Sequence, residues 1–219
     1  MITEERMRTY INSLDAGSTA FLQDLEAEAL KAGVPVIRKE MQSFLRFLLV
    51  SYRPLHILEV GTAVGFSALW MSEYAPEGCR ITTIEKYEKR IPAARDNFAR
   101  AGREDQITLL EGDAMEILQR LEGSYDFIFM DAAKGQYLSY LPEILRLLEP
   151  GGILVSDNVL QDGDIIESRF AVERRNRTIH ARMREYLHEL THCGELTTSI
   201  LPLGDGVTVS VRNRTEKEE

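Results

Sequence analysis

Two apolar runs in the second half of the chain each end in an aspartate. Residues 125–130 read YDFIFM and lead into Asp131, while residues 151–156 read GGILVS and lead into Asp157 and Asn158. Short apolar runs of this kind predict buried strands. Two carboxylates and an amide oxygen are hard ligands that suit Mg²⁺, with water or substrate oxygens completing the octahedron. If the two strands are neighbours in a parallel sheet, their carboxyl ends bring this set together.

A lysine, Lys134, follows Asp131 by three residues and would stand near a cation bound there. A neighbouring positive charge lowers the pKa of an ammonium group, so Lys134 could accept a proton from an acceptor hydroxyl. A bound metal would lower the pKa of that hydroxyl as well. Each acid also has a plain structural explanation, because Asp157 and Asn158 form turns and Asp131 could cap the following helix. The lysine favours the catalytic interpretation.

The elements that must position these side chains follow from hydrophobic periodicity. Residues 1–50 read as helices throughout, whereas from residue 55 onward short apolar runs alternate with helical segments. The apolar runs are HILEV, RITTIE, QITLL, YDFIFMD and GGILVSD. This alternation predicts a parallel sheet with helices on both faces. The closing ELTTSILPLGDGVTVSVR adds two strands joined by a Pro/Gly/Asp turn, the last of them antiparallel to its neighbour.

The predicted fold is therefore a single α/β domain over residues 1–219, with a seven-stranded, mostly parallel sheet and a helical extension at residues 1–50. A length of 219 residues with 44% hydrophobic content suits one such domain. The charged tail at 213–219 is predicted to be disordered. The apolar runs are too short to span a bilayer and the N-terminus lacks a signal-peptide core, so we expect a cytoplasmic protein with no membrane partner.

Charge and cysteine content narrow the function classes. The formal net charge of −9 argues against a surface that binds nucleic acid everywhere, although it leaves room for a local basic patch. Cys79 and Cys193 fit no closely spaced metal-ligand pattern and are expected to be ordinary thiols. Trp70 is expected in the core.

The residues that follow the first three predicted strands suggest a nucleoside site. Gly61 and Gly65 bracket a turn into a helix, but position 63 is alanine, where a dinucleotide-binding pattern needs glycine for backbone to approach a pyrophosphate. Glu85 ends the second strand, where an acid can accept hydrogen bonds from ribose hydroxyls. Asp113 follows the third strand, where it could bind the amino group of an adenine. It could also simply cap the next helix. Together they indicate a nucleoside ligand without phosphate, such as S-adenosylmethionine.

The chain resembles the class I, metal-dependent O-methyltransferases of the catechol and caffeoyl-CoA type. The motifs that carry the resemblance are ILEVGTAVGFSA, TTIEKYEKR, GDAMEIL, FIFMDAAKGQY and SDNVL, over most of residues 34–160. The resemblance implies a homodimer, metal ligation by Asp131, Asp157 and Asn158, and catalytic roles for Lys134 and Asp131. The cofactor contacts that it implies are Ile37, Glu59, Gly61, Ser67, Glu85, Asp113 and Asp131. Ile37 stands where relatives often have methionine, so a backbone contact would survive and a sulfur contact would not.

The acceptor is harder to predict, because catechols and 5-hydroxyuracil both offer two neighbouring oxygens. VPVIRKE, SDNVLQDG and PLGDGVTVS resemble the bacterial tRNA 5-hydroxyuridine methyltransferases. This branch implies methylation of 5-hydroxyuridine to 5-methoxyuridine at the wobble position of the tRNA anticodon loop. The alternative is a small catechol or a caffeoyl-CoA-type thioester. A non-catalytic module that kept the fold is disfavoured by the complete set of site residues.

An arginine-rich segment favours the RNA acceptor. Six arginines lie between positions 169 and 184: Arg169, Arg174, Arg175, Arg177, Arg182 and Arg184. The segment follows the second aspartate-ended strand, so Arg174, Arg175 and Arg177 are predicted to contact tRNA phosphates. The phosphates of a CoA thioester, or a solvated basic face, are the alternatives. A helix near 171–192 is expected to bury Ile179, Met183, Tyr186, Leu187 and Leu190. His180, His188 and His192 are expected on its surface or at an interface.

Overall fold

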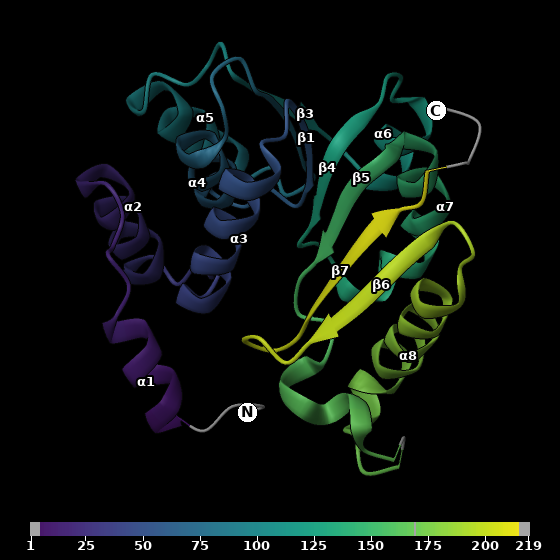
Figure 1. Ribbon diagram of the computed structural model, residues 1–219. Coiled ribbons are helices and arrows are strands. Elements are labelled where there is room, and N and C mark those ends of the chain that lie inside the picture. The colour runs from purple at the N-terminus through teal and green to yellow at the C-terminus, as the bar shows by residue number, and fades with distance from the viewer. Residues whose placement is uncertain (1–4, 169, 215–219) are drawn as a thin grey trace. The chain divides into compact units, whose positions relative to one another are not determined.

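The computed structural model describes residues 5–168 and 170–214, which fall into two compact units, residues 5–117 and residues from 118 onward. Figure 1 shows the helices and strands of both units. The single domain predicted for residues 1–219 stays a prediction. Arg169 and most of the tail predicted to be disordered lie outside the described residues.

The first unit opens with three helices, which confirms the helical extension. They are α1 (Glu5–Ser13), α2 (Ala20–Lys31) and α3 (Lys39–Tyr52). The hydroxyl oxygen of Thr19 accepts a hydrogen bond from the backbone N–H of Leu22 at 3.4 Å, which caps α2. In the described residues α1 buries none of its side chains, whereas α3 buries an apolar stripe that includes Leu45 and Leu49.

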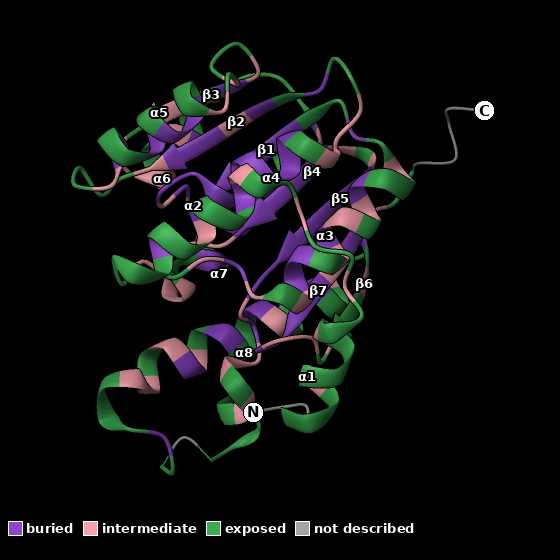
Figure 2. Ribbon diagram, turned by 90° about the vertical axis from the view of Figure 1, so that its left-hand side faces the viewer, coloured by how far each residue is buried: buried purple, intermediate pink, exposed green. Residues whose placement is uncertain are grey.

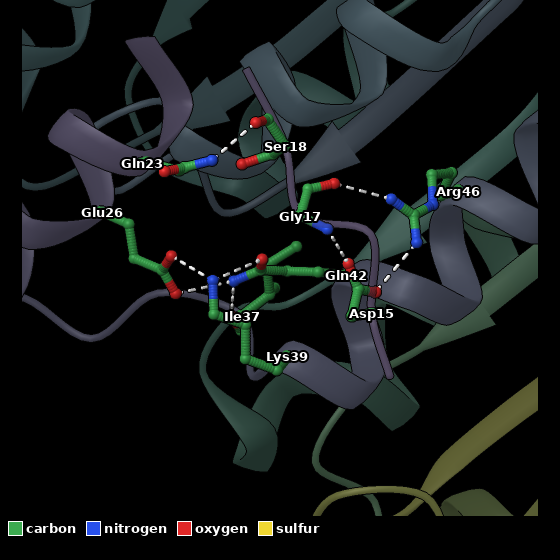
Figure 3. A network of polar contacts seen from close by, with 9 residues as sticks. All are labelled: Asp15, Gly17, Ser18, Gln23, Glu26, Ile37, Lys39, Gln42 and Arg46. Atoms are coloured by element: carbon green, nitrogen blue, oxygen red, sulfur yellow. Dashed lines mark hydrogen bonds and ion pairs between the residues drawn. The ribbon is translucent and has the colours of Figure 1, made fainter. Parts of the chain in front are cut away.

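Polar side chains tie these helices and the loops between them together (Figure 3). The amide of Gln42 donates to Glu26 of α2 and to the backbone carbonyl of Ile37, each at 2.9 Å. The carboxylate of Glu26 also pairs with Lys39. Arg46 reaches back to Asp15 at 2.8 Å. The loop that carries Ile37 is thus fixed against α2 and α3.

Three parallel strands complete the first unit. They are β1 (His56–Val60), β2 (Arg80–Glu85) and β3 (Ile107–Glu111), in the order β3-β2-β1. The crossovers are α4 (Phe66–Tyr74) and α5 (Ile91–Arg100), and α6 (Ala114–Arg120) begins after β3. Trp70 is 2% exposed and its indole N–H donates to the carbonyl of Gln42 at 3.0 Å, which confirms its place in the core. Both β1 and α4 are largely buried (Figure 2).

The second unit holds four strands in the order β4-β5-β7-β6. They are β4 (Tyr125–Met130), β5 (Leu148–Ser156), β6 (Leu196–Leu201) and β7 (Val207–Arg212). β4 and β5 are parallel, while β7 is antiparallel to both β5 and β6, as the closing turn predicted. The described residues therefore contain the seven strands that the sequence predicts.

Helices of the second unit connect and cover these strands. The short 3₁₀ helix η1 (Lys134–Gln136) leads into α7 (Tyr137–Leu147), and the 3₁₀ helices η2 (Gln161–Ile166) and η3 (Arg174–Asn176) precede α8 (Arg177–His192). α8 packs against η1, α7 and β6. The helix begins at residue 177 rather than near 171, because the preceding residues form a turn and η3.

The position expected for His180 in α8 is wrong, and Ile179 and Leu187, which were expected on the buried face, are only half-buried. His180 is 2% exposed and lies on the buried face with Met183, Tyr186 and Leu190, although the sequence placed it on the surface or at an interface. The spacing explains the error, since position 180 falls three residues before Met183 on the same face of the helix. His188 and His192 are exposed, as expected.

Two further expectations concern the membrane and the cysteines. No helix among residues 5–168 and 170–214 is long and apolar enough to cross a membrane. Cys79 is buried and Cys193 is half-buried, and neither forms a disulfide within the described residues.

Candidate functional site

The second unit brings the ends of β4 and β5 together. Met130 and Ser156 are partners in the parallel register, so Asp131 and Asp157 follow paired positions. The backbone N–H of Asp157 donates to the carbonyl of Met130 at 2.9 Å, which extends the ladder one step beyond the strands. The predicted pair of acids therefore sits at neighbouring strand ends of one sheet.

Burial and like charge make this pair costly to ionise. Asp157 is 5% exposed and Asp131 is half-buried. Burial raises the pKa of Asp131 to about 6, against the pull of Lys134. Burial, and then the charge of Asp131, raises the pKa of Asp157 to about 8. A cation between these carboxylates would offset both effects.

Lys134 lies in η1, and its ammonium nitrogen is 3.6 Å from a carboxylate oxygen of Asp205. About a third of the Lys134 side chain is exposed, whereas that of Asp205 is buried. Sequence reasoning missed Asp205, which belongs to the PLGDG turn before β7. A usable signal was present: a strand antiparallel to β5 must begin near the end of β5, so an acid just before it lies beside Asp157.

Asn158 adopts a left-handed backbone conformation with a φ of 59°. Its backbone N–H donates to a carboxylate oxygen of Asp157 at 2.7 Å, and its side-chain amide donates to Asp205 at 2.5 Å. Asparagine tolerates this conformation better than most residues. The turn-forming role considered for Asp157 and Asn158 is therefore realised, and it leaves the amide oxygen of Asn158 facing away from Asp205.

The first unit carries the glycine turn after β1. Gly61 and Gly65 have φ values of 110° and 84°, and Ala63 between them is also left-handed at 48°. A side chain at Gly65 would meet the ring of Phe98 at 2.5 Å, so this position requires glycine. The backbone N–H of Ala63 donates to the carboxylate of Glu85 at 2.7 Å. The turn is thus anchored to the end of β2.

Glu85 and Asp113 both have protein partners. The carboxylate of Glu85 also accepts from the backbone N–H groups of Lys86 at 3.0 Å and Tyr87 at 2.7 Å. Asp113 accepts from the N–H of Met115 at 3.0 Å, which is the capping role considered for it, and pairs with Lys86 at 3.0 Å. The hydrogen bond from Lys86 holds the pKa of Asp113 below its ordinary value. Cofactor contacts by these acids stay predictions.

Three other predicted cofactor residues, Glu59, Ser67 and Ile37, are buried in the protein. Glu59 is completely buried, and its carboxylate accepts the hydroxyl of Thr83 at 2.5 Å. Ser67 in the first turn of α4 is 8% exposed. The carbonyl of Ile37 already accepts the amide of Gln42, so a backbone contact to a cofactor there would use its N–H or its second lone pair.

Several arginines of the arginine-rich segment bond to groups within the protein, which the sequence does not suggest. Arg177 donates to the carbonyls of Val172 and Phe170, and Arg175 pairs with Glu173 at 2.7 Å. Arg182 donates to the carbonyl of Gly135 at 2.9 Å and Arg184 to that of Ile165 at 3.3 Å. Arg174 and Arg175 in η3 are exposed. Two of the three arginines predicted to contact RNA therefore also have bonds inside the protein.

The acids and the amide fit a hard divalent cation by their donor chemistry. The predicted ligand set has two carboxylates and one amide oxygen, and burial raises the pKa of both carboxylates in spite of the nearby Lys134. In the part of the chain that the structure describes, no three His, Cys, Asp or Glu side chains are placed as a metal site by themselves. Metal binding by Asp131, Asp157 and Asn158 stays a prediction.

Comparison with known proteins settles the family. A model of a family described as O-methyltransferase matches residues 12–213. The chain belongs to this O-methyltransferase family. A catechol O-methyltransferase of Niastella koreensis is 36% identical over 143 residues, which cover 63% of this chain and 65% of that protein. A caffeoyl-CoA O-methyltransferase of Eucalyptus globulus is 31% identical, covering 77% of this chain and 71% of that one.

Solved structures of methyltransferases share the fold over nearly the whole chain. A Podospora anserina methyltransferase bound to S-adenosylhomocysteine is 28% identical with a TM-score of 0.86, covering 96% of this chain and 95% of its own. A Bacillus cereus O-methyltransferase, also with S-adenosylhomocysteine, is 25% identical with a TM-score of 0.84, covering 97% and 100%. The predicted class I methyltransferase fold is thereby confirmed.

Proposed function

We propose that this O-methyltransferase transfers the methyl group of S-adenosylmethionine to one hydroxyl of a small acceptor with two neighbouring oxygens, with Mg²⁺ in the site. Catechol and caffeoyl-CoA, the acceptors named for its relatives, have this chemistry. The observation that carries the proposal is the cluster of Asp131, Asp157, Asn158 and Lys134 at the ends of β4 and β5.

The site residues divide the chemistry between them. Asp131, Asp157 and Asn158 would hold the cation, which when bound lowers the pKa of the acceptor hydroxyl. Lys134 as the free amine would accept the proton of the acceptor hydroxyl, and the ammonium that results would stabilise the oxyanion. In the first unit, Glu85 would bind the ribose hydroxyls of the methyl donor, while Asp113 would take the adenine amino group. Glu59, Gly61, Ser67, Ile37 and Asp131 are the other proposed cofactor contacts.

Positioning is expected to supply much of the rate. Methyl transfer needs the nucleophilic oxygen and the methyl carbon in line and nearly in contact, and such orientation can be worth roughly 7–11 kcal/mol. The buried carboxylate of Asp157 and the half-buried carboxylate of Asp131 favour this, because a cation held by them would be partly shielded from solvent.

A transfer assay tests the proposal. Labelled S-adenosylmethionine is offered with catechol, with caffeoyl-CoA and with tRNA that carries 5-hydroxyuridine. We expect transfer to a small acceptor that EDTA abolishes and Mg²⁺ restores. Asp157→Ala should remove most activity while sparing the affinity for S-adenosylmethionine in calorimetry. Full turnover in EDTA would refute the role of the metal.

A tRNA acceptor remains a second candidate because Arg174 and Arg175 are both exposed in η3. If they contact phosphates, Arg174→Ala with Arg175→Ala should weaken tRNA binding. The log–log salt slope should then fall by about 0.7 for each phosphate of a single strand that the variant no longer neutralises. The control replaces Arg95 and Arg103, which pair with Glu111 and Glu73 in the first unit. Methylation of tRNA alone, without any small acceptor, would establish this second function.

The homodimer and the cytoplasmic location that the sequence suggested stay proposals. Tyr10 and Ile11 of α1 and Leu14 just after it are more than half exposed, and a second copy would cover these apolar side chains favourably. Light scattering on the wild type and on Ile11→Glu tests this, because the charged variant should shift a dimer toward monomer.

A further inference from the structure

Asp205 connects the proposed metal site to the proposed base. One of its carboxylate oxygens accepts the side-chain amide of Asn158 at 2.5 Å, and the other lies 3.6 Å from the ammonium nitrogen of Lys134. Asp205 is itself only 5% exposed. A single buried carboxylate therefore contacts a predicted metal ligand and the predicted proton acceptor at the same time.

The contact with Asn158 fixes which amide atom faces the site. An ionised carboxylate only accepts hydrogen bonds, so the amide nitrogen must point to Asp205 and the amide oxygen must point away from it. Without this acceptor the amide could rotate and present its NH₂ group to a cation, which repels it. The bond thus selects the one orientation of Asn158 that can bind a metal.

The backbone holds Asp205 in place for this role. The N–H of Leu160 donates to the carbonyl of Asp205, and that of Val159 donates to the carbonyl of Gly206, both at 2.9 Å. Gly206 has a φ of 96°, and a side chain there would lie 2.3 Å from Leu160. The turn before β7 is therefore pressed against the segment that follows β5, with no room for a larger residue than glycine.

We propose that Asp205 is a positioning residue of this O-methyltransferase, which orients the amide of Asn158 toward the cation and holds Lys134 beside it. The inference rests on the proposed metal-dependent function and goes further, since it assigns a role to a residue outside the ligand set. Both carboxylate oxygens of Asp205 already have partners, which sets it behind the ligands rather than among them. Substitution of a residue that holds a metal ligand in place commonly lowers the affinity for the metal by about 10–100-fold.

Two substitutions separate the two contacts. Asp205→Asn keeps an oxygen that can accept the amide of Asn158 but removes the charge opposite Lys134. Asp205→Ala removes both. Asp164→Asn serves as the control, because Asp164 is an exposed acid of η2 in the same unit.

Binding of Mn²⁺, measured by electron paramagnetic resonance without any acceptor, is the first readout. We expect Asp205→Ala to weaken Mn²⁺ binding about 10–100-fold. Asp205→Asn should recover part of that loss, while the control binds as the wild type does. Affinity for S-adenosylmethionine should be unchanged in all three variants. With saturating metal, Asp205→Asn should still lower kcat more than it changes KM, because Lys134 has lost its partner.

Exchange of the side-chain amide protons of Asn158, followed by NMR without metal, is the second readout. Exchange should be slow in the wild type and in Asp205→Asn, and fast in Asp205→Ala. Fast exchange of the Asn158 amide protons in the wild type would overturn the proposal. So would Mn²⁺ binding by folded Asp205→Ala within about twofold of the wild-type affinity, because a positioning residue should change it more. If neither the wild type nor Asp157→Ala binds Mn²⁺, the metal-dependent function itself fails, whereas the exchange data still decide whether Asp205 orients Asn158.

Discussion

The hydroxyl of Tyr137 lies 3.1 Å from the backbone carbonyl oxygen of Asp157, at the point where β5 ends. The same hydroxyl is 3.1 Å from the carbonyl of Met130 and accepts the N–H of Ala132 at 3.3 Å. Tyr137 is completely buried at the start of α7. One side chain therefore bonds to the backbone on both sides of Asp131 and to Asp157 itself.

Removing this hydroxyl should loosen both strand ends. Tyr137→Phe leaves the N–H of Ala132 without its acceptor and the two carbonyls without their shared donor. We expect a loss of about 1–3 kcal/mol in the free energy of unfolding. Tyr10→Phe removes the same atom from an exposed tyrosine and should cost almost nothing. Urea denaturation compares the two, and equal stabilities would show that the buried hydroxyl contributes little.

The buried acids predict an unusual dependence of stability on pH in the metal-free protein. Burial and the charge of Asp131 raise the pKa of Asp157 from an ordinary value of 3.8 to about 8. Between these values the folded chain keeps a proton that the unfolded chain releases, so the free energy of unfolding falls as pH rises from about 4 to about 8. Below about pH 4 both states are protonated and the group contributes no slope.

Denaturation in EDTA at about pH 5, 6.5 and 8 measures this fall. Asp157→Asn should be more stable than the wild type at the highest of these pH values, with a shallower pH dependence, whereas Asp164→Asn should follow the wild type. Saturating Mg²⁺ should reverse the fall in the wild type, because the cation binds the ionised pair. A wild-type stability that rises with pH over this range in EDTA would contradict the assignment.

Much of the site could be predicted because it follows directly from strand ends. Apolar runs locate β4 and β5, and whatever follows them in a parallel sheet is brought to one edge, which is why Asp131 and Asp157 were found. The same logic located Glu85 at the end of β2. In these cases a local pattern determines the position.

The parts that were missed depend on contacts between distant segments. Asp205 lies 47 residues from Asn158, and only the pairing of β7 with β5 brings them together. The sequence of charges does not reveal that Arg177 and Arg182 donate hydrogen bonds to backbone carbonyls. The arginine-rich segment therefore seemed more available to phosphates than it is. His180 was misplaced because a polar residue on a buried face is the exception to amphipathic patterning.

Glu85 should control the affinity for S-adenosylmethionine. Glu85→Gln keeps the shape of the side chain but loses the charge that strengthens hydrogen bonds to ribose hydroxyls, so we expect binding to weaken by about 1–3 kcal/mol. Glu85→Ala should also loosen the glycine turn, because the N–H of Ala63 loses its acceptor. Calorimetry measures the affinity and thermal denaturation the fold. Glu88→Gln, in the exposed loop that follows, is the control. Unchanged affinity in Glu85→Gln would place the ribose elsewhere.

Arg182 should support catalysis through the loop that carries Lys134. Its guanidinium donates to the carbonyl of Gly135 at 2.9 Å and thereby ties α8 to η1. Arg182→Ala frees this carbonyl, so Lys134 should be held less firmly over the acceptor. A displacement of about 1 Å at a reacting group can cost up to about a hundredfold in rate. We expect kcat to fall measurably, while the affinities for S-adenosylmethionine and Mn²⁺ stay near those of the wild type.

The matched control is Arg184→Ala, which removes an equal charge from α8 but frees the carbonyl of Ile165 in η2 instead. Its kcat should stay close to the wild-type value. Arg182→Lys keeps a hydrogen-bond donor on a shorter side chain, so its kcat should lie between those of Arg182→Ala and the wild type. If Arg182→Ala and Arg184→Ala lower the rate equally, the effect belongs to the charge of the helix and not to the bond with Gly135. In that case a general attraction for an anionic acceptor would explain the arginines better than the positioning of Lys134.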